Sequence, residues 1–563
     1  MPRLLLGLLL GALLALSPAS AQETPPNFVI LFADDLGIND LGCFGRKDQR
    51  TPNLDKLAAE GARFTQAYAA ASVCSPSRAG LLTGQSPARL KITTFLTGRS
   101  DRASHRVLAA PINLHLPDGV QTIAQLLKPK GYVSAAVGKW HLGGKGHQPT
   151  DHGFDESFTG KVNPGAESPQ GGKGELGQAD AAVKFIERSK GKPFFLYLAF
   201  DNPHIPLAAP AKGIEANAKS FHPTYAALVE SLDTAVGRVL KALEDHGLAK
   251  NTFVVFASDN GGVHVSELKE SPATYNAPTR AGKGFLYEGG IRTPLIIRFP
   301  GRLAVREIAE PVVLGDICPT ICALAKVTPP AVQDFKDLSP LLFDSKPANA
   351  TPRALYWHQP HYMNQGGKPA GVIREGDWKL IEQYEDGSLE LYNLAKDPGE
   401  RTDLAAAEPA RVAALRGKLE AWRRSVGAAP LTYQWTFNGV ALTGATGATL
   451  PVPTVQSSHV GSYAVVVSNA AGSVVSSSVM LSALASVVPP VVTPPPVVAT
   501  APVITTQPAA RTVVAGGGAS FGVVAAGTAP LTYQWRRDGQ VIAGASNATL
   551  TLDNIQSAAA GTY

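Results

Sequence analysis

Between residues 27 and 300 the chain alternates short apolar runs with amphipathic stretches. This alternation is typical of an α/β fold, in which helices cover both faces of a largely parallel sheet. The predicted strands are residues 28–32, 132–138, 193–200, 253–258 and 294–299. The clearest predicted helix, residues 225–246, stops before Gly247 and has one apolar face, formed by Leu228, Leu232, Val236, Val239, Leu240 and Leu243.

A chain of 563 residues exceeds the usual size of one domain, so we expect several folding units. We predict an α/β catalytic domain over residues 22–345. After about residue 348 the pattern changes to short strands, with a turn at Asp386 and Gly387, and then a helix. We therefore predict a smaller α+β subdomain over residues 346–426.

The tail repeats itself, because APLTYQW occurs at residues 429–435 and again at 529–535. Short Val/Thr/Ser-rich runs, a Trp on an early strand and a Gly-x-Tyr corner predict all-β, immunoglobulin-like modules without the disulfide. The predicted modules span residues 427–485 and 502–563, and a stiff Pro/Val-rich linker, 486–501, joins them. We expect both modules to be incomplete, the second because Tyr563 falls within a strand.

The first 21 residues have the pattern of a signal peptide. Arg3 gives a positive start, residues 4–16 are apolar, and Ala19-Ser20-Ala21 fits a cleavage site. An uncleaved membrane anchor is the alternative, but this stretch is shorter than the ~20 residues that a spanning helix needs. We predict an exported protein (periplasmic, cell-surface or extracellular) without a membrane span.

The composition, 44% hydrophobic and 17% charged residues, is that of an ordinary globular protein. A net charge of +6 is small for this length, and a pI near 8.9 gives only weak support for a polyanionic partner. We expect no nucleic-acid partner. The four cysteines are too few for a disulfide framework. Cys318 and Cys322 lie four apart on a predicted helix, and they fit buried apolar positions better than a metal site.

Two acidic turns follow predicted strands. Asp34 and Asp35 come after strand 28–32, and Asp259-Asn260 comes after strand 253–258, followed by two glycines. Each turn alone could be a plain loop or a helix cap. Ligands of open α/β sheets bind at the carboxyl ends of strands, and adjacent carboxylates become tolerable around a hard divalent cation. Together the two turns indicate a shared metal site.

The most specific motif is Cys74-Ser75-Pro76-Ser77-Arg78, followed by LLTG at 81–84. Cys74 could be a nucleophile activated by the positive charge of Arg78, or a buried structural residue. The motif resembles the signature of the type I, formylglycine-dependent sulfatases of the alkaline-phosphatase superfamily. The resemblance extends, in order, through NFVILFADDLG (27–37), TPNLD (51–55), GKWHLG (138–143), NPH (202–204), SDNGG (258–262), GKG (282–284) and EGGIRTP (288–294).

This resemblance implies a large mixed sheet flanked by helices, and hydrolysis of sulfate esters. It implies that Cys74 is oxidised to formylglycine, whose hydrate supplies the nucleophilic hydroxyl. It also implies that Asp34, Asp35, Asp259 and Asn260 hold Ca²⁺ together with the modified Cys74. A formylglycine-generating or anaerobic maturating enzyme is therefore an expected partner.

The same resemblance assigns roles to five further residues. Arg78 and Lys139 would stabilise the formylglycine hydrate and the sulfate. His141 would be the base that removes the second hydroxyl proton, so that the aldehyde reforms and sulfate leaves. His204 and Lys283 would contact the ester and assist the leaving oxygen.

Other polar residues receive weaker assignments. We expect Arg50 and Arg292 to be structural. The region 99–118 is a predicted loop over the cleft, so four histidines are candidates for substrate contact: His105, His115, His147 and His152.

The expected substrate is a sulfated glycan, with galactose or N-acetylgalactosamine sulfate as the first choice. Residues 87–99, 282–294 and 358–394 resemble bacterial proteins of the arylsulfatase A-like and N-acetylgalactosamine-sulfatase-like groups. The tail would bind glycan or the cell surface. The alternatives are a phosphodiesterase or phosphonate hydrolase of the same superfamily, and an inactive glycan-binding protein in which Cys74 stays a thiol.

Overall fold

The protein was analysed as a computed structural model. It describes residues 24–100, 102, 105, 107, 109–160, 163–267, 272–344, 353–428, 432–445, 450–452, 455–469, 472–482, 501–527 and 531–563. The predicted signal peptide and nearly all of the predicted linker lie outside these residues. Among the helices that are described, none is both long and apolar enough to cross a membrane.

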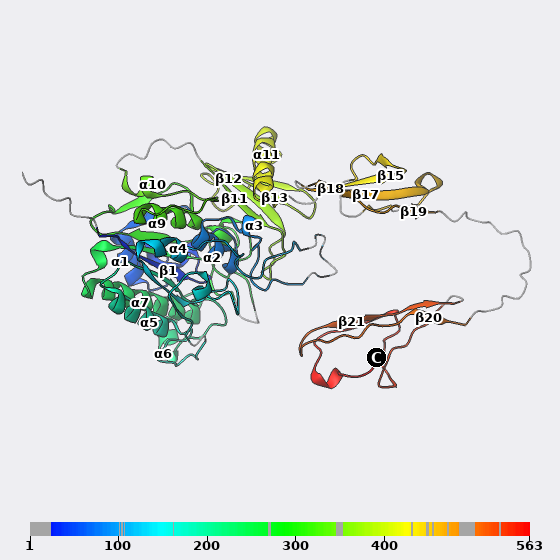
Figure 1. Ribbon diagram of the computed structural model, residues 1–563, viewed down its shortest axis with the longest axis horizontal. Helices are drawn as coiled ribbons and strands as arrows, with labels where there is room; N and C mark the ends of the chain where they lie inside the picture. Colours follow the sequence, from blue (N-terminus) through cyan, green and yellow to red (C-terminus); the bar gives the residue numbers. More distant parts are fainter. Residues whose placement is uncertain are drawn as a thin grey trace, which may run out of the picture. The chain divides into compact units, whose positions relative to one another are not determined.

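The centre of the fold is an eight-stranded sheet in the order β5-β4-β6-β1-β7-β8-β2-β9. Strand β1 of this sheet is labelled in Figure 1, among the helices α1, α4 and α7. The strands of the sheet are β1 (Asn27–Ala33), β2 (Ala62–Phe64), β4 (Val133–Gly138), β5 (Glu156–Phe158), β6 (Phe194–Ala199), β7 (Thr252–Ser258), β8 (Leu295–Arg298) and β9 (Arg306–Ile308). The five apolar runs recognised in the sequence are β1, β4, β6, β7 and β8.

The sheet is mixed, as the family resemblance implies. The expectation of a largely parallel sheet holds only from β5 to β7. Strand β8 runs antiparallel to both β7 and β2, while β9 is parallel to β2. The physical reason is that the chain leaves the sheet at the carboxyl end of β7 and enters β8 from that same end. Such a connection needs no crossover to the opposite end of the sheet.

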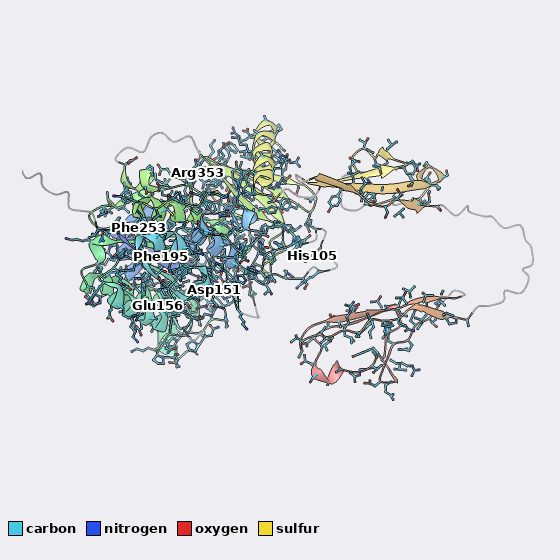
Figure 2. All side chains as sticks on the ribbon, in the orientation of Figure 1. His105, Asp151, Glu156, Phe195, Phe253 and Arg353 are labelled. Carbon is cyan, nitrogen blue, oxygen red and sulfur yellow. The ribbon has the colours of Figure 1, made fainter. Side chains whose placement is uncertain are left out.

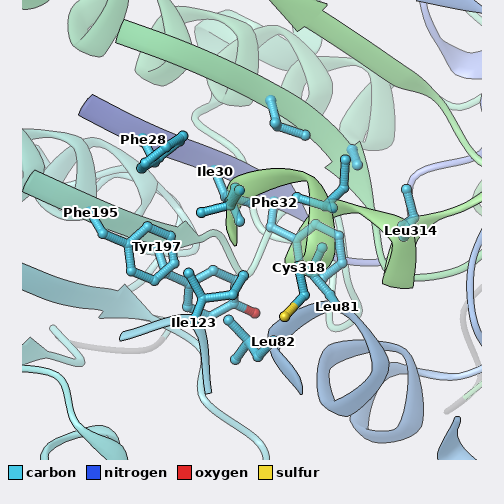
Figure 3. Packing of buried hydrophobic residues seen from close by; sticks show 14 of the residues in the cluster. Phe28, Ile30, Phe32, Leu81, Leu82, Ile123, Phe195, Tyr197, Leu314 and Cys318 are labelled. Carbon is cyan, nitrogen blue, oxygen red and sulfur yellow. The ribbon is translucent and has the colours of Figure 1, made fainter. Parts of the chain in front are cut away.

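A layer of helices covers each face of the sheet. Successive side chains of β1 point to opposite faces, so alternate residues pack against different layers. Phe28, Ile30 and Phe32 pack against α2 (Cys74–Thr83), α4 (Ile123–Leu127), α9 (Ile317–Ala325) and α10 (Ser339–Phe343), as Figure 3 shows in part. Val29 and Leu31 pack against α1 (Pro52–Ala59), α5 (Glu175–Ser189) and α7 (Pro223–Asp245). Phe195 and Phe253 mark the first of these two cores in Figure 2.

The remaining elements of this unit are short. They are β3 (Ala67–Tyr68), parallel to β10 (Val312–Val313), α3 (Pro87–Leu90), α6 (Ala211–Ala216) and α8 (Glu288–Ile291). The 3₁₀ turns of the chain are Ile38–Asp40, Gly42–Phe44, Lys128–Lys130, Pro149–His152, Ala249–Asn251, Leu314–Asp316, Ser457–His459 and Ser557–Ala559.

The predicted α+β subdomain is an antiparallel sheet, β11 (Ala354–Gln359), β12 (Ala370–Glu375), β13 (Trp378–Gln383) and β14 (Leu389–Asn393), followed by α11 (Pro409–Ser425). One face packs against Leu415 and Leu419 of α11. The other face, through Trp357, packs against Tyr68 and Ile291 of the catalytic domain. This small sheet is therefore held between α11 and the part of the catalytic domain that contains Tyr68 and Ile291.

A buried ion network joins this small sheet to β3 and α8 of the catalytic domain. The Lys379 ammonium, on β13, donates to Glu288 Oε1 over 3.1 Å and lies 2.7 Å from Glu400 Oε1. Tyr68 donates its hydroxyl to Glu288 Oε2 over 2.7 Å, and Arg374 donates to the Tyr68 oxygen. Lys379 is fully buried, so its ammonium group has lost its hydrating water. Among the described residues, the Glu288 and Glu400 carboxylates are the charged groups that stabilise it in place of that water.

The chain divides into two compact units, one of residues 1–451 and 463–478 and one of residues 452–462 and 479–563. Strands β15 (Thr432–Phe437), β16 (Val440–Ala441), β17 (Gly461–Asn469) and β18 (Gly472–Val475) form antiparallel pairs, and they belong to the first unit except for the first two residues of β17. In the second lie β19 (Val479–Leu481), β20 (Val503–Thr506), β21 (Ala519–Gly522), β22 (Val524–Ala526), β23 (Arg536–Arg537), β24 (Gln540–Val541) and β25 (Thr549–Leu552). The pairs β20–β22, β21–β25 and β23–β24 are antiparallel. Immunoglobulin-like modules remain a prediction.

The ion network predicts a specific stability loss. Lys379→Met should lower the free energy of unfolding by about 3–5 kcal/mol, because it removes the cation that pairs with Glu400 and leaves Glu288 with the more distant Arg292, at 3.8 Å. Urea denaturation of the purified protein measures it. Lys418→Met removes a half-exposed lysine that pairs with Glu375, and should cost at most about 1 kcal/mol. Equal losses in the two variants would contradict this account.

Candidate active site

The predicted site residues converge at one edge of the central sheet. Asp34, Lys139 and Asp259 each follow directly on a parallel strand, β1, β4 and β7 respectively. The register aligns the ends of these strands, since Ala33 pairs with Ser258, and Gly138 and Phe32 both pair with Ala199. Residues that lie far apart in the sequence therefore meet at the carboxyl ends of neighbouring strands.

Buried charges of opposite sign are paired throughout this edge. The Lys139 ammonium donates to Asp34 Oδ2 over 2.6 Å. The Arg78 guanidinium, which is fully buried, donates to Asp259 Oδ2 from Nε over 3.1 Å and from a terminal nitrogen over 2.7 Å. Arg78 also donates to the Lys139 carbonyl oxygen over 2.9 Å. The two hydrogen bonds to Asp259, together with the one to Lys139, fix the position of the Arg78 guanidinium.

Asp35 adopts a left-handed backbone with φ of 66°. Consecutive side chains of an extended strand point to opposite faces, and this conformation breaks that alternation, so the Asp34 and Asp35 carboxylates approach each other. Lys283 donates to Asp35 Oδ2 over 2.7 Å, and the Asn260 amide donates to Asp35 Oδ1 over 2.8 Å. The Asp35 backbone N–H donates to Asp259 Oδ1 over 3.1 Å.

The turn that carries Asp259 and Asn260 packs directly on the EGGIRTP segment. The Gly261 N–H donates to the Gly290 carbonyl over 3.0 Å, and an added Cβ at Gly261 would lie 1.8 Å from the Gly289 oxygen. No side chain fits between the two backbones. The glycines of both motifs therefore allow the close approach that positions the Asp-Asn turn.

Cys74 begins α2 and is buried. Burial raises the pKa of its thiol far above the ordinary value, although the cations of Lys139 and Lys283 act in the opposite direction. The thiol is therefore uncharged at neutral pH. This finding argues against the interpretation of Cys74 as a thiolate nucleophile activated by nearby charge.

His141 has one ring nitrogen that is available to accept a proton. Its Nε2 lies 2.9 Å from the Leu96 carbonyl oxygen, which can only accept, so Nε2 carries the hydrogen. Its Nδ1 is buried and has no hydrogen-bond partner among the described residues. Burial and the neighbouring Lys139 cation lower the pKa of His141 to about 4. The imidazole is therefore neutral at physiological pH and able to accept a proton at Nδ1.

His204 forms a pair with Lys283. Its Nδ1 faces the Ile205 carbonyl oxygen, while Nε2 lies 3.1 Å from the Lys283 ammonium and 3.5 Å from Asp35 Oδ2. Burial lowers the pKa of His204 to about 4. A neutral ring next to an ammonium is the stable combination, with Nε2 accepting from Lys283.

The ligand atoms of Asp34, Asp35, Cys74 and His204 lie within 4.8 Å of one another. Two oxygens, Asp34 Oδ1 and Asn260 Oδ1, are buried without a hydrogen-bond partner among the described residues. Buried oxygens that lack donors are the ligands that a hard cation such as Ca²⁺ satisfies. The residues present therefore fit a metal ion.

Asp259 stands apart from this compact group of four. Both of its oxygens already accept hydrogen bonds, from Arg78 and from the Asp35 backbone. Burial and the neighbouring Asp34 carboxylate raise the pKa of Asp259 to about 7. Sequence reasoning gave His204 a role at the ester only, so its position in the group of four was missed. A sequence pattern offers no signal for that placement, because His204 reaches the group from a separate loop.

A pocket of about 840 Å³ opens beside these groups. Five predicted site residues line it: Cys74, Lys139, His141, His204 and Lys283. Three loop segments complete the wall, with Phe95, Arg99, Arg102 and His105 from the first, Ser266 and Glu267 from the second, and Tyr362 to Gly367 from the third.

Of the four histidines proposed for substrate contact, only His105 lines this pocket. The rings of His115 and His147 stack with centroids 3.5 Å apart, and His152 lies 5.9 Å from His147. The Trp140 indole donates to the His147 carbonyl over 2.8 Å. These three histidines pack on one another and near Trp140, so their assignment to substrate contact was wrong.

Arg292 and Arg50 have the structural contacts that were expected of them. Arg292 Nε donates to the Thr65 carbonyl over 2.9 Å, and Arg50 pairs with Glu230 over 2.6 Å.

Comparison with known proteins identifies this architecture. The model of the Sulfatase family matches residues 26–327, which include all the site residues described above up to Lys283. The chain belongs to the sulfatase family. A second model, N-sulphoglucosamine sulphohydrolase, C-terminal, matches residues 281–424, from the Lys283 loop through α11.

Relatives of this sulfatase support the assignment. It is 33% identical to mouse (Mus musculus) steryl-sulfatase over 522 residues, covering 70% of this chain and 81% of that protein. It is 35% identical to human (Homo sapiens) N-acetylgalactosamine-6-sulfatase over 449 residues, covering 69% and 83%. A crystal structure of Ps i-CgsB with k-i-k-neocarrahexaose superposes with a TM-score of 0.59 at 28% identity, covering 71% and 93%. This sulfatase is accordingly a sulfuric ester hydrolase.

Proposed function

We propose that this sulfatase is an exported, calcium-dependent enzyme that removes sulfate from a glycan, through a formylglycine formed from Cys74. The observation that supports this proposal most directly is the pocket, in which Cys74 lies with two ammonium groups and two neutral imidazoles. Galactose or N-acetylgalactosamine sulfate is the first choice of substrate. The names of the human relative and of the ligand in the similar crystal structure support a sulfated sugar.

The cation would be held by Asp34, Asp35, the modified Cys74 and Asn260, with Asp259 as the fifth ligand that the family resemblance implies. The two unpartnered oxygens, of Asp34 and Asn260, support this arrangement. Bound Ca²⁺ would offset the charge of the carboxylates and draw electron density from the sulfate oxygens. The formylglycine hydrate would supply a hydroxyl nucleophile in place of a thiol that burial keeps protonated.

The remaining residues would act on charge and protons. Lys139 and Lys283 would bind the sulfate oxygens, where negative charge is concentrated during transfer. His141 would take a proton at Nδ1, its free nitrogen. Lys283 would pass a proton toward the departing sugar oxygen, with His204 Nε2 holding the ammonium in place over 3.1 Å. Arg78 lies behind these groups and would keep Asp259 ionised.

Export and processing complete the proposal. The leader-like start of the sequence supports export, and the predicted oxidation of Cys74 requires a maturating enzyme as a partner. The tail repeats would bind glycan or the cell surface.

The first prediction tests the nucleophile. Wild-type protein, coexpressed with a formylglycine-generating enzyme, should hydrolyse 4-nitrophenyl sulfate, and Cys74→Ala should lower kcat at least about 10⁴-fold with an unchanged melting temperature. Cys43→Ala, at a half-buried thiol outside the pocket, is the matched control and should keep full activity. Mass spectrometry of the Cys74 peptide should find the aldehyde. An intact thiol in active protein, or faster hydrolysis of bis(4-nitrophenyl) phosphate, would overturn the proposal.

The second prediction concerns pH. The base must be neutral, and burial holds the pKa of His141 at about 4, so kcat/KM should stay level as pH falls and decline only near pH 4. His141→Gln should lower kcat by about 10²–10⁴-fold across the pH range, and any decline near pH 4 that remains would be that of His204, whose pKa is also about 4. A pH–rate profile of both proteins measures it. A decline centred above pH 6 in the wild type would count against His141 as the base.

The third prediction uses stability instead of activity. Ca²⁺ at about 100 times its dissociation constant should stabilise the protein by about 2.7 kcal/mol, seen as a higher melting temperature. Asp35→Asn should abolish this rise, because the amide removes one anionic ligand. Asp180→Asn changes an exposed carboxylate on α5 and should leave the rise intact. The same rise in all three proteins would show that the cation binds elsewhere.

A further inference from the structure

We infer that the pocket selects substrates with a second anionic group beside the scissile sulfate, and that Arg99 and Arg102 bind this group. The inference rests on the proposed function, because it takes the sulfate to lie at Cys74. It deepens that function by naming the substrate class, a glycan with two nearby anions.

Arg99 and Arg102 line the same pocket as Cys74 and His141. Neither guanidinium forms an ion pair with a carboxylate of any residue that the structure describes. Other arginines of the catalytic unit differ: Arg78 is paired with Asp259 and Arg89 with Asp334. Within the described part of the chain, two cations without a paired anion therefore face a cavity large enough for a sugar.

The two guanidinium groups also interact with each other. Partial burial and the positive charge of Arg102 both lower the pKa of Arg99. Like charges close together are unfavourable unless an anion lies between them. A bound sulfate or carboxylate would supply that anion.

The charged groups already described in the pocket do not supply it. Lys139 and Lys283 are paired with Asp34 and Asp35, on the side of Cys74. Glu267 also lines the pocket, and it accepts a hydrogen bond from Gln365. Burial raises the pKa of Glu267, which favours its neutral form. Among the described residues that line the pocket, none therefore offers the two arginines an ionised partner.

Two described residues on either side of the arginines, Leu96 and His105, are held by contacts with other parts of the fold. The Leu96 carbonyl accepts from His141, which ties Leu96 to the reacting groups. The His105 ring stacks on Tyr362 with centroids 3.9 Å apart and planes inclined by 19°. His105, labelled in Figure 2, also accepts from the Arg102 backbone N–H over 3.2 Å. These contacts keep the arginines on the pocket wall.

Guanidinium groups bind sulfate and carboxylate with the same forked geometry. The second anion can therefore be another sulfate ester or the carboxylate of a neighbouring uronic acid, and the experiment separates the two sources. Galactose-type sugars with one sulfate and no second anion would bind more weakly, since they offer the two arginines no anion.

The test measures affinity without turnover. Calorimetry on the Cys74→Ala protein, with Ca²⁺ present, compares three ligands: N-acetylgalactosamine 6-sulfate, N-acetylgalactosamine 4,6-disulfate, and the disaccharide of glucuronic acid with N-acetylgalactosamine 6-sulfate. At least one of the two ligands with a second anion should bind about tenfold more tightly than the monosulfate. The ligand that gains affinity identifies the source of the anion.

Arg99→Gln/Arg102→Gln, made in the same protein, should bind the three ligands alike. Lys91→Gln/Lys145→Gln removes the same charge from exposed lysines outside the pocket and should keep the tenfold preference. Equal affinities before the arginines are changed, or a preference that survives their removal, would overturn the inference. Failure of wild-type enzyme to cleave 4-nitrophenyl sulfate would instead reject the proposed function, and the two failures can be told apart because the affinities are measured without turnover.

Discussion

The pairing of buried charges at one edge of the central sheet is the constraint on which the site depends. Asp34, Asp35 and Asp259 lie fully desolvated, and each has a cation, from Lys139, Lys283 and Arg78 respectively, within 2.7 Å. A buried charge is tolerable only with such a partner. The partners come from separate segments, and the parallel register of β1, β4 and β7 brings Asp34, Lys139 and Asp259 to the same edge.

The antiparallel sheet of strands β11 to β14 also supports the active site. Its ion network holds α8 through Glu288, and α8 contains the glycines that support the Asp259–Asn260 turn. The loop between β11 and β12 supplies Tyr362 to the pocket, where this ring meets His105. Packing that stabilises the fold thereby also places the wall that faces the substrate, so the reacting groups and the wall belong to different parts of one rigid assembly.

Sequence reasoning reached much of the fold and of the site from local signals. Buried strands appear as unbroken apolar runs, and α7 appears as a 3.6-residue period, so both were placed within a few residues. Asp34, Asp35 and Asp259 were recognised because strand ends carry ligands in open α/β sheets. The direction of β8 was not recognised, because an apolar run carries no mark of parallel or antiparallel pairing.

The sequence by itself determined the catalytic motif, the order of the strands along the chain and the membership of the sulfatase family. Only the tertiary structure decided that His204 joins the group around Asp34, that His115 and His147 stack away from the pocket, and that Arg99 and Arg102 face it with no ion-pair partner among the described residues. The physical reason is that motifs and periodicities are local, whereas neighbours across a pocket are set by how distant loops pack on the sheet. The charge balance of a site is a property of those neighbours.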